Sequence, residues 1–318
     1  MSAFLEPFER MLDDVATPTA VRAVEQGDSA VAMWAAFAES GFLDALVPEE
    51  RGGAGLSLAE VQPLWMALGA HAVPLPVGET MIARALVADM PEGPVALAVA
   101  PPGQGVVVPC GRVAEFVLVE ADGGLHLAPA VGAPTGVAAS IAARLQWDAF
   151  ATPVSAGPLG GLRAIAAILR AALIAGAADR LTHMTAAYAN ERVQFGKPIG
   201  RQQALQQQMA VMAEEAVAAR IAAQLGCAGG FPPPLAAAAT AKSVASRAAA
   251  RVAATAHAVH GAIGISAEHD VQLFTRRLHE WRLADGSEGY WNRQLGEVRL
   301  ASAAGSVDFV REAMFPVD

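Results

Sequence analysis

Charged residues are scarce in this sequence. Asp, Glu, Lys and Arg together make up 17% of its 318 residues, against about 25% in an ordinary globular protein. The charges that are present are mostly acidic, with 31 Asp and Glu against 22 Lys and Arg, which gives a formal net charge of −9. Because phosphate binding needs a basic surface, this balance argues against a protein whose main task is to bind nucleic acid.

The sequence also lacks signs of secretion. Its two cysteines, Cys110 and Cys227, cannot form a metal cluster by themselves and do not suggest a secreted disulfide scaffold. The first residues, MSAFLEPFERMLDD, are acidic and have neither the basic region nor the apolar run of a signal peptide. We therefore expect a cytoplasmic protein with buried or idle thiols.

Long unbroken hydrophobic runs are absent, although the mean hydropathy of +0.36 is high. The two longest stretches without Asp, Glu, Lys or Arg are residues 123–143 and 221–241, and glycine and proline interrupt both. A helix that crosses a bilayer needs about 20 consecutive apolar residues that satisfy their own backbone. We therefore expect no membrane span.

The chain is rich in alanine, which favours helix. Its sequence divides into three successive zones. Residues 1–90 are helical in pattern, residues 91–150 hold short β-favouring runs separated by turns, and residues 151–318 are helical again. The expected fold class is mainly α with a small β domain. In chain order it has an N-terminal helical domain, a short middle β-sheet domain and a C-terminal four-helix bundle.

Local signals place elements within these zones. Ser57 and Glu60 form the pattern of a capping box at the start of a helix that Gly69 is expected to end. The β-favouring runs predict a small antiparallel sheet from four strands, at residues 95–99, 105–108, 116–119 and 125–127. Four helices are expected in the last zone. The first carries an apolar stripe over residues 165–176, and the others cover residues 201–224, 235–260 and 290–304.

Two segments could bind a ligand. In YANERVQFGKPI, Arg192 could pair with a phosphate and Phe195 could lie against a heterocycle, although basic residues also suit an ordinary helix C-terminus. In HAVHGAIGI, Gly261 and Gly264 suggest close backbone approach, for example to a pyrophosphate. The nearby histidines His257, His260 and His269 do not have the spacing of helix-face metal ligands, so no metal site is expected.

A third segment, LADGSEGY, places Asp285 and Glu288 in a glycine-rich loop before a helix. Either carboxylate could act as a base. The alternative is that Ser287 caps the helix and the acidic residues lie favourably in its first turn. Judged on the residues alone, the capping interpretation is favoured.

Together these segments resemble the acyl-CoA dehydrogenase family. The resemblance is carried by YANERVQFGKPIGRQQALQQQMA, AVHGAIGISAEHDVQLFTRR, LADGSEGYWNRQLG and, near the start, GFLDALVPEERGGAGLSLAEV. It implies an FAD-dependent dehydrogenase that oxidises an acyl-CoA thioester between its α and β carbons. It also implies an electron-transfer flavoprotein, or a similar protein, as electron acceptor.

The resemblance also assigns residues. Arg192, Gln194 and Phe195 match family positions that contact the FAD of a neighbouring subunit. Gly261 and Gly264 match a glycine segment near the cofactor's pyrophosphate, in which Ala262 replaces a glycine and Ala258 a glutamine.

The family's catalytic glutamate falls at Asp285, which the resemblance therefore makes the candidate base. An alternative base position, near Ala166, cannot serve. Because aspartate is one methylene shorter, the carboxylate of Asp285 retreats by about 1.5 Å unless the backbone compensates.

The middle zone is short for the family, since residues 88–151 hold no Thr-Glu-Pro-type loop. This resembles the shorter subunits of heteromeric bacterial acyl-CoA dehydrogenases, and implies a homo-oligomer or a heteromer with a full-length subunit. Two alternatives stay open. The chain could be a non-catalytic subunit that completes its partner's flavin site. It could also be a flavoenzyme of the nitroalkane oxidase type in which Asp285 acts on a carbon acid without CoA.

Overall fold

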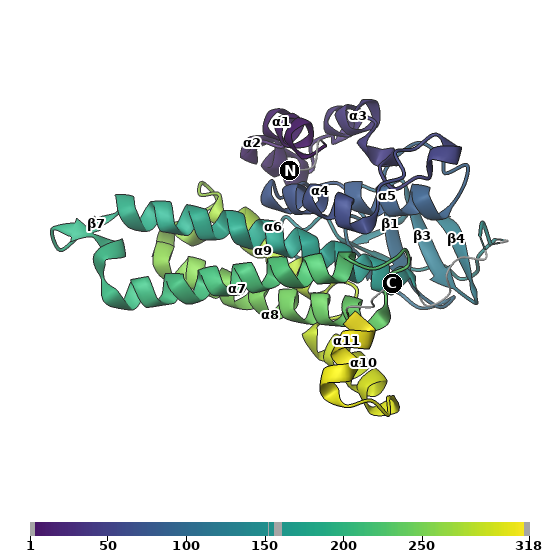
Figure 1. The fold of residues 1–318 in the computed structure, drawn as a ribbon. Coiled ribbons are helices and arrows are strands. Elements are labelled where there is room, and N and C mark those ends of the chain that lie inside the picture. Colours follow the sequence, from purple (N-terminus) through teal and green to yellow (C-terminus); the bar gives the residue numbers. More distant parts are fainter. Residues whose placement is uncertain (1–3, 152, 156–160, 315–318) are drawn as a thin grey trace.

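The computed structural model describes residues 4–151, 153–155 and 161–314 of the chain. A layer of helices lies over one end of a helix bundle, and the small sheets lie beside both (Figure 1). The fold is mainly α with a small β region, as the sequence predicts. The helices before the sheets are α1 (Leu5–Val15), α2 (Pro18–Gln26), α3 (Val31–Glu39), α4 (Leu58–Ala70) and α5 (Val77–Leu86).

The predicted capping box is present at the start of α4. The Ser57 hydroxyl accepts a hydrogen bond from the Glu60 amide at 3.3 Å, and the Glu60 carboxylate accepts one from the Ser57 amide at 2.9 Å. Gly69, however, does not end the helix, which continues to Ala70. Glycine is required at this position for another reason: α4 packs closely on the helix α6 (Leu162–Glu191).

Two glycines let the backbones of α4 and α6 touch. A Cβ atom on Gly69 would lie 2.1 Å from the carbonyl oxygen of Leu173, and one on Gly176 would lie 1.9 Å from that of Met66. Real Cβ atoms do not approach this closely, so both positions require glycine. The small residues that the sequence places along the 165–176 stripe therefore do allow close helix packing.

The four predicted strands are present, but the sheet arrangement differs from the expectation. The described part of the middle zone forms two three-stranded sheets, and β1 pairs with β3 in parallel because β2 pairs with β6 in the other sheet. The sequence did not predict β5 and β6, which are three residues long and carry no β-favouring run of their own. The strands are β1 (Val95–Val99), β2 (Val106–Val108), β3 (Phe116–Ala121), β4 (Gly124–Pro129), β5 (Gly132–Pro134) and β6 (Ala143–Leu145).

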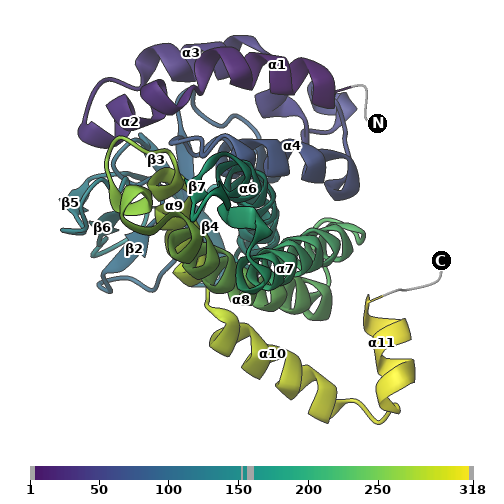
Figure 2. The same ribbon diagram turned by 90° about the vertical axis from the view of Figure 1, so that its left-hand side faces the viewer.

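The bundle consists of α6, α7 (Gln203–Cys227), α8 (Leu235–His260) and α9 (Val271–Leu283), which Figure 2 shows nearly end-on. The sequence expected its fourth helix at residues 290–304 and did not identify α9. The segment 290–304 falls on α10 (Glu288–Ala301), which packs on α8 and then leads away from the bundle to α11 (Ser306–Met314).

The boundaries expected at residues 90 and 150 fall in the segments between α5 and β1 and between β6 and α6, and as domain limits they stay a prediction. None of the described helices is long and apolar enough to cross a membrane. Cys110 and Cys227 are buried free thiols, and burial raises the pKa of both.

The contact between α4 and α6 makes a first prediction. Gly176→Ala should lower the free energy of unfolding by about 1–3 kcal/mol, because the added methyl group forces the helices apart. Gly296→Ala is the matched control, since Gly296 lies in α10 with nothing within 4 Å of an added Cβ. Urea unfolding should show Gly296→Ala unchanged or stabilised by up to about 1 kcal/mol. Equal stability of the two variants would contradict the packing argument.

Candidate functional site

The predicted flavin residues of the YANERVQFGKPI segment lie on a small hairpin that follows α6. Its strands are β7 (Val193–Gln194) and β8 (Lys197–Pro198), and its turn is Phe195-Gly196, with φ angles of 51° and 76°. Positive φ at both central residues matches the type I′ turn of tight hairpins. Arg192 and Gln194 are exposed, and Phe195 is 93% exposed. The hairpin projects from the far end of the bundle (Figure 1).

The second predicted flavin segment lies at the same end. The ring of His260, the last residue of α8, stacks on Tyr188 of α6 with a centroid distance of 4.4 Å. The short 3₁₀-helix η4 (Gly261–Ile265) follows directly. The structure therefore gathers all five predicted cofactor residues at one end of the bundle.

The two glycines of η4 differ in their surroundings. Gly261 is exposed, has a φ angle of 61°, and has nothing within 4 Å of an added Cβ. Gly264 is buried, and an added Cβ would lie 2.9 Å from the Cβ of His260. Packing therefore explains Gly264, whereas the positive φ angle by itself favours glycine at position 261, and the space beside Gly261 is open.

The chemistry of this end fits an FAD. An exposed guanidinium, an exposed amide and an exposed aromatic ring are suited to phosphate and heterocycle contacts. In addition, Nδ1 of His257 and Nε2 of His260 are buried and have no hydrogen-bond partner among the described residues. Burial lowers the pKa of His260, which favours its neutral form. Within the described segments no group of three or more His, Cys, Asp or Glu is arranged to hold a metal ion.

Asp285 lies at the opposite end of the bundle, in the turn that follows α9. Arg170 of α6 contacts Asp285, and Arg192 follows the last residue of the same helix. Because an α-helix rises by about 1.5 Å per residue, Arg170 and Arg192 are about 30 Å apart. Asp285 borders two cavities, one of 220 Å³ against β1 and β2 and one of 380 Å³ against residues 135–144 and the end of α9. One chain therefore does not bring its predicted base and its predicted flavin residues together.

The Asp285 carboxylate belongs to a buried ion cluster that we call the Arg170 triad (Glu79, Arg170 and Asp285). Nε of Arg170 donates to Oδ2 of Asp285 at 3.0 Å, and Nη1 donates to Oε1 of Glu79 at 2.5 Å. The side chains of Arg170 and Glu79 are 1% and 3% exposed, and that of Asp285 is 11% exposed. Burial alone would lower the pKa of Arg170, but the two carboxylates, Glu79 foremost, raise it above its ordinary value.

Lys242 and Trp291 hold the turn around Asp285 from two other helices. Nζ of the buried Lys242 donates to the carbonyls of Arg282 and Gly286 at 2.9 and 2.8 Å and to Ser246 at 3.0 Å. The indole N–H of Trp291 donates to the Asp285 carbonyl at 3.0 Å. Asp285 and Gly286 have φ angles of 57° and 100°, an arrangement that costs energy for aspartate and persists only when its surroundings fix it.

The sequence did not identify Glu79, Arg170 or Lys242. Arg170 lies in a run of alanine, leucine and isoleucine on α6, and Lys242 lies among the alanines of α8. A single charge in an apolar helical run was the available signal, since such a charge must find a partner when the helix is buried. Ala166, one turn before Arg170, is buried and carries no functional group.

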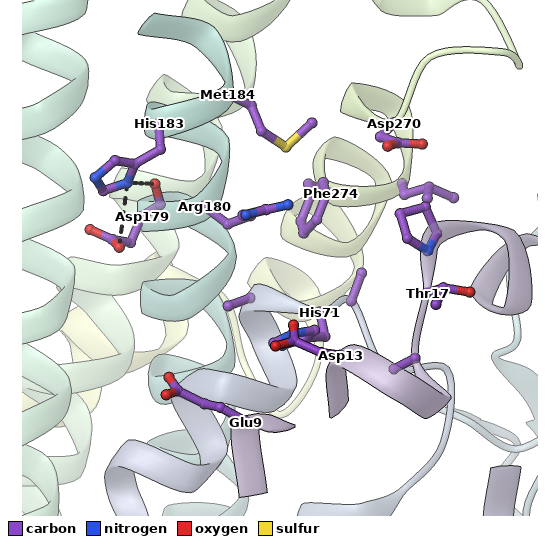
Figure 3. A pocket seen from close by; sticks show the side chains of 15 residues that line it. Glu9, Asp13, Thr17, His71, Asp179, Arg180, His183, Met184, Asp270 and Phe274 are labelled. Carbon is purple, nitrogen blue, oxygen red and sulfur yellow. Dashed lines mark hydrogen bonds and ion pairs between the residues drawn. The ribbon is translucent and has the colours of Figure 1, made fainter. Parts of the chain in front are cut away.

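A further cavity, of 470 Å³, lies between α1, α4, α6 and α9 (Figure 3). His71 and His183 face it, each beside a carboxylate: Asp13 at 3.1 Å and Asp179 at 3.6 Å respectively. It contains neither Asp285 nor any of the five predicted flavin residues.

Comparison with known proteins agrees with the fold and with both helical zones. Residues 2–90 match the family model "Acyl-CoA dehydrogenase, N-terminal domain", and residues 164–301 match "Acyl-CoA dehydrogenase, C-terminal domain". The acyl-CoA dehydrogenase IpdE2 of Mycobacterium tuberculosis is 35% identical over 83% of this chain and 86% of its own length. The chain belongs to the acyl-CoA dehydrogenase family. The IpdE2 of Mycolicibacterium smegmatis is 32% identical, over 86% of this chain and 90% of its own.

Solved structures of the family have the same fold. The ChsE4-ChsE5 complex from Mycobacterium tuberculosis contains a chain with a TM-score of 0.77 and 23% identity, covering 94% of this chain and 97% of that one. The Tcur3481-Tcur3483 steroid ACAD gives a TM-score of 0.78 and 26% identity over 95% and 98%. The family uses FAD to dehydrogenate acyl-CoA thioesters, and this chain is a short, 318-residue member.

Lys242 gives the site a pH-dependent property that can be measured. Burial lowers its pKa from 10.5 to about 7, although Asp285 acts in the opposite direction. From pH 7 to about pH 9, the ordinary pKa of the two buried thiols, the unfolded chain binds more protons than the folded one because of Lys242, so the free energy of unfolding should rise with pH across this window. In Lys242→Met this rise should be absent, as urea unfolding at a series of pH values would show. Lys197→Met, at an exposed position on β8, should keep it.

Proposed function

We propose that the chain is one subunit of an oligomeric FAD-dependent acyl-CoA dehydrogenase and that Asp285 is its catalytic base. The observation that carries this proposal is the separation of about 30 Å between the predicted flavin residues and Asp285, estimated from the rise of α6. A complete site then needs the hairpin of one subunit and the Asp285 turn of another. The assembly is a homo-oligomer or a heteromer with a full-length acyl-CoA dehydrogenase subunit.

One observation supports a heteromer. Two solved relatives, ChsE4-ChsE5 and Tcur3481-Tcur3483, are named as pairs of different chains. In a homo-oligomer or a heteromer alike, the almost wholly exposed ring of Phe195 would be covered by the neighbouring subunit. In this arrangement Arg192, Gln194, Phe195 and Gly261 contact the flavin nucleotide of the neighbouring subunit.

In the proposed reaction, Asp285 removes a proton from the carbon next to the thioester carbonyl. Bound FAD would supply the acceptor for the hydride that leaves the β carbon. Asp285 lies between two cavities, and this supports the assignment because an acyl chain could enter beside its carboxylate. The electrons would pass on to an electron-transfer flavoprotein or a similar acceptor.

A second candidate is a non-catalytic subunit that only completes the flavin site of its partner. One observation favours it: Oδ2 of Asp285 is already hydrogen-bonded to the buried Arg170. Because the Asp285 side chain is also one methylene shorter than glutamate, its remaining oxygen has less reach toward a substrate.

The flavin part of the proposal can be tested on the assembled protein. Co-expression with a full-length acyl-CoA dehydrogenase subunit should yield a yellow complex. Arg192→Ala should raise the dissociation constant for FAD by about 10- to 100-fold, the usual worth of a hydrogen bond to a charged group. Flavin fluorescence during titration would measure it. Arg10→Ala, which also removes an exposed arginine but from α1, should leave FAD binding unchanged, and equal effects of the two variants would argue against the hairpin.

The base can be tested in the same complex. Asp285→Asn should lower dye-linked turnover of acyl-CoA by about 10²- to 10⁴-fold, the usual contribution of a general base. Asp122→Asn is the matched control, because Asp122 also has a positive φ angle but lies exposed in the turn between β3 and β4. Unchanged turnover in Asp285→Asn would favour the non-catalytic subunit. Turnover of nitroalkanes in place of acyl-CoA would favour the nitroalkane oxidase type.

A further inference from the structure

The Arg170 triad joins three segments that are far apart in the chain. Glu79 comes from α5, Arg170 from α6, and Asp285 from the turn after α9, with sequence separations of 91 and 115 residues. Arg170 therefore contacts the proposed base directly and has a second, closer carboxylate on its other side. A buried arginine needs only one carboxylate to balance its charge, so the second one calls for an explanation.

When Asp285 accepts a proton, the net charge of the buried triad falls to zero. With both carboxylates ionised the triad carries one net negative charge. When Asp285 is protonated, Arg170 and Glu79 remain as a neutral pair, and no buried charge is left without a partner. Without Glu79, protonation of Asp285 would leave the buried guanidinium unpaired, which is strongly unfavourable.

The geometry around Asp285 agrees with such a role. Arg170 holds Oδ2, whereas no donor among the described residues contacts Oδ1. One oxygen is thus fixed and the other is available to a substrate in an adjoining cavity. The charged side chains around the turn, apart from the triad, are Lys242, the paired Arg282 and Glu288, Arg163 beside one cavity, and Arg144 and Glu280 beside the other.

We propose that Arg170 and Glu79 are positioning residues for Asp285: Arg170 orients its carboxylate, and Glu79 balances the charge of Arg170 so that Asp285 can accept a proton. This inference rests on the proposed function, in which Asp285 is the base. In that step the Cα–H bond of the thioester breaks and an O–H bond forms on Asp285. The substrate loses two electrons with the β-hydride, for which bound FAD would be the acceptor.

The competing explanation is that the triad only fastens α5 to the bundle. A second buried ion cluster allows the positioning role and this structural role to be distinguished. Glu25 of α2 is 2% exposed and pairs with Arg276 and Arg277 of α9 at 2.5 and 2.8 Å. It also joins an N-terminal helix to the bundle, but it contacts neither Arg170 nor Asp285, so Glu25→Gln removes a comparable buried ion pair without touching the triad.

The experiment compares variants of this chain in its complex with the full-length subunit, with the acyl-CoA thioester that the wild type turns over fastest. In a plot of kcat/KM against pH, we expect the acidic limb of Glu79→Gln to lie about one pH unit lower than that of the wild type. Asp285 becomes the sole counterion of Arg170 in this variant, which favours its ionised form. The plateau kcat should fall by up to about tenfold, because a weaker base removes the proton less readily. Glu79→Asp keeps the charge and should keep the limb in place.

Arg170→Gln should lower kcat by about 100-fold with little change in KM, because the carboxylate is no longer oriented. Arg170→Lys keeps the charge but loses the guanidinium that donates from Nε to Asp285 and from Nη1 to Glu79. It should also lower kcat while the acidic limb of the pH profile stays at its wild-type pH, and it provides the test if Glu79→Gln does not fold. Glu25→Gln should lose stability but keep the wild-type pH profile.

The outcomes separate this inference from the proposed function. If Asp285→Asn abolishes turnover while Glu79→Gln and Glu25→Gln give the same pH profile, the positioning role is wrong and the base assignment stands. A wild-type kcat in Arg170→Lys would equally contradict it. If Asp285→Asn turns over normally, both the base assignment and the positioning role fail.

Discussion

The buried guanidinium of Arg170 is the interaction on which the arrangement of this molecule depends. A charge with 1% exposure is costly unless its hydrogen-bonding groups find acceptors. Here the acceptors for Nε and Nη1 come from the turn after α9 and from an N-terminal helix, so the ion pairs of one side chain on α6 fix the positions of both. The turn itself has two residues with positive φ, and Lys242 and Trp291 hold it from α8 and α10. The proposed base is thus set by contacts from three helices.

The bundle separates two kinds of chemistry along its length. One end offers exposed groups that suit a nucleotide, on the hairpin and on η4. The other end holds a buried ion cluster that borders two cavities and includes the proposed base. A single bundle of this length cannot join them, which is why the proposed enzyme is an oligomer.

The features that the sequence predicted correctly are those that depend on residues close together in the chain. The capping box at Ser57 and the first four strands followed from local patterns, and so did the alternation of helical and β zones. The family motifs led to Arg192 and Asp285. What it did not predict depended on distant contacts. The helix α9, which the sequence did not identify, contains Arg276 and Arg277, and both pair with Glu25, about 250 residues earlier. In the same way Arg170 finds its partners across separations that no local pattern encodes, and Gly69 is explained only by Leu173.

The touching backbones of α4 and α6 have a mechanical consequence. Helices slide past one another by small adjustments of the side chains between them, but at Met66 and Gly176 no side chain intervenes. The N-terminal helices and the bundle should therefore move as one rigid body. The two small sheets form the other wall of the cavities beside Asp285, so an opening that admits a substrate in the proposed reaction would involve their strands of three to six residues.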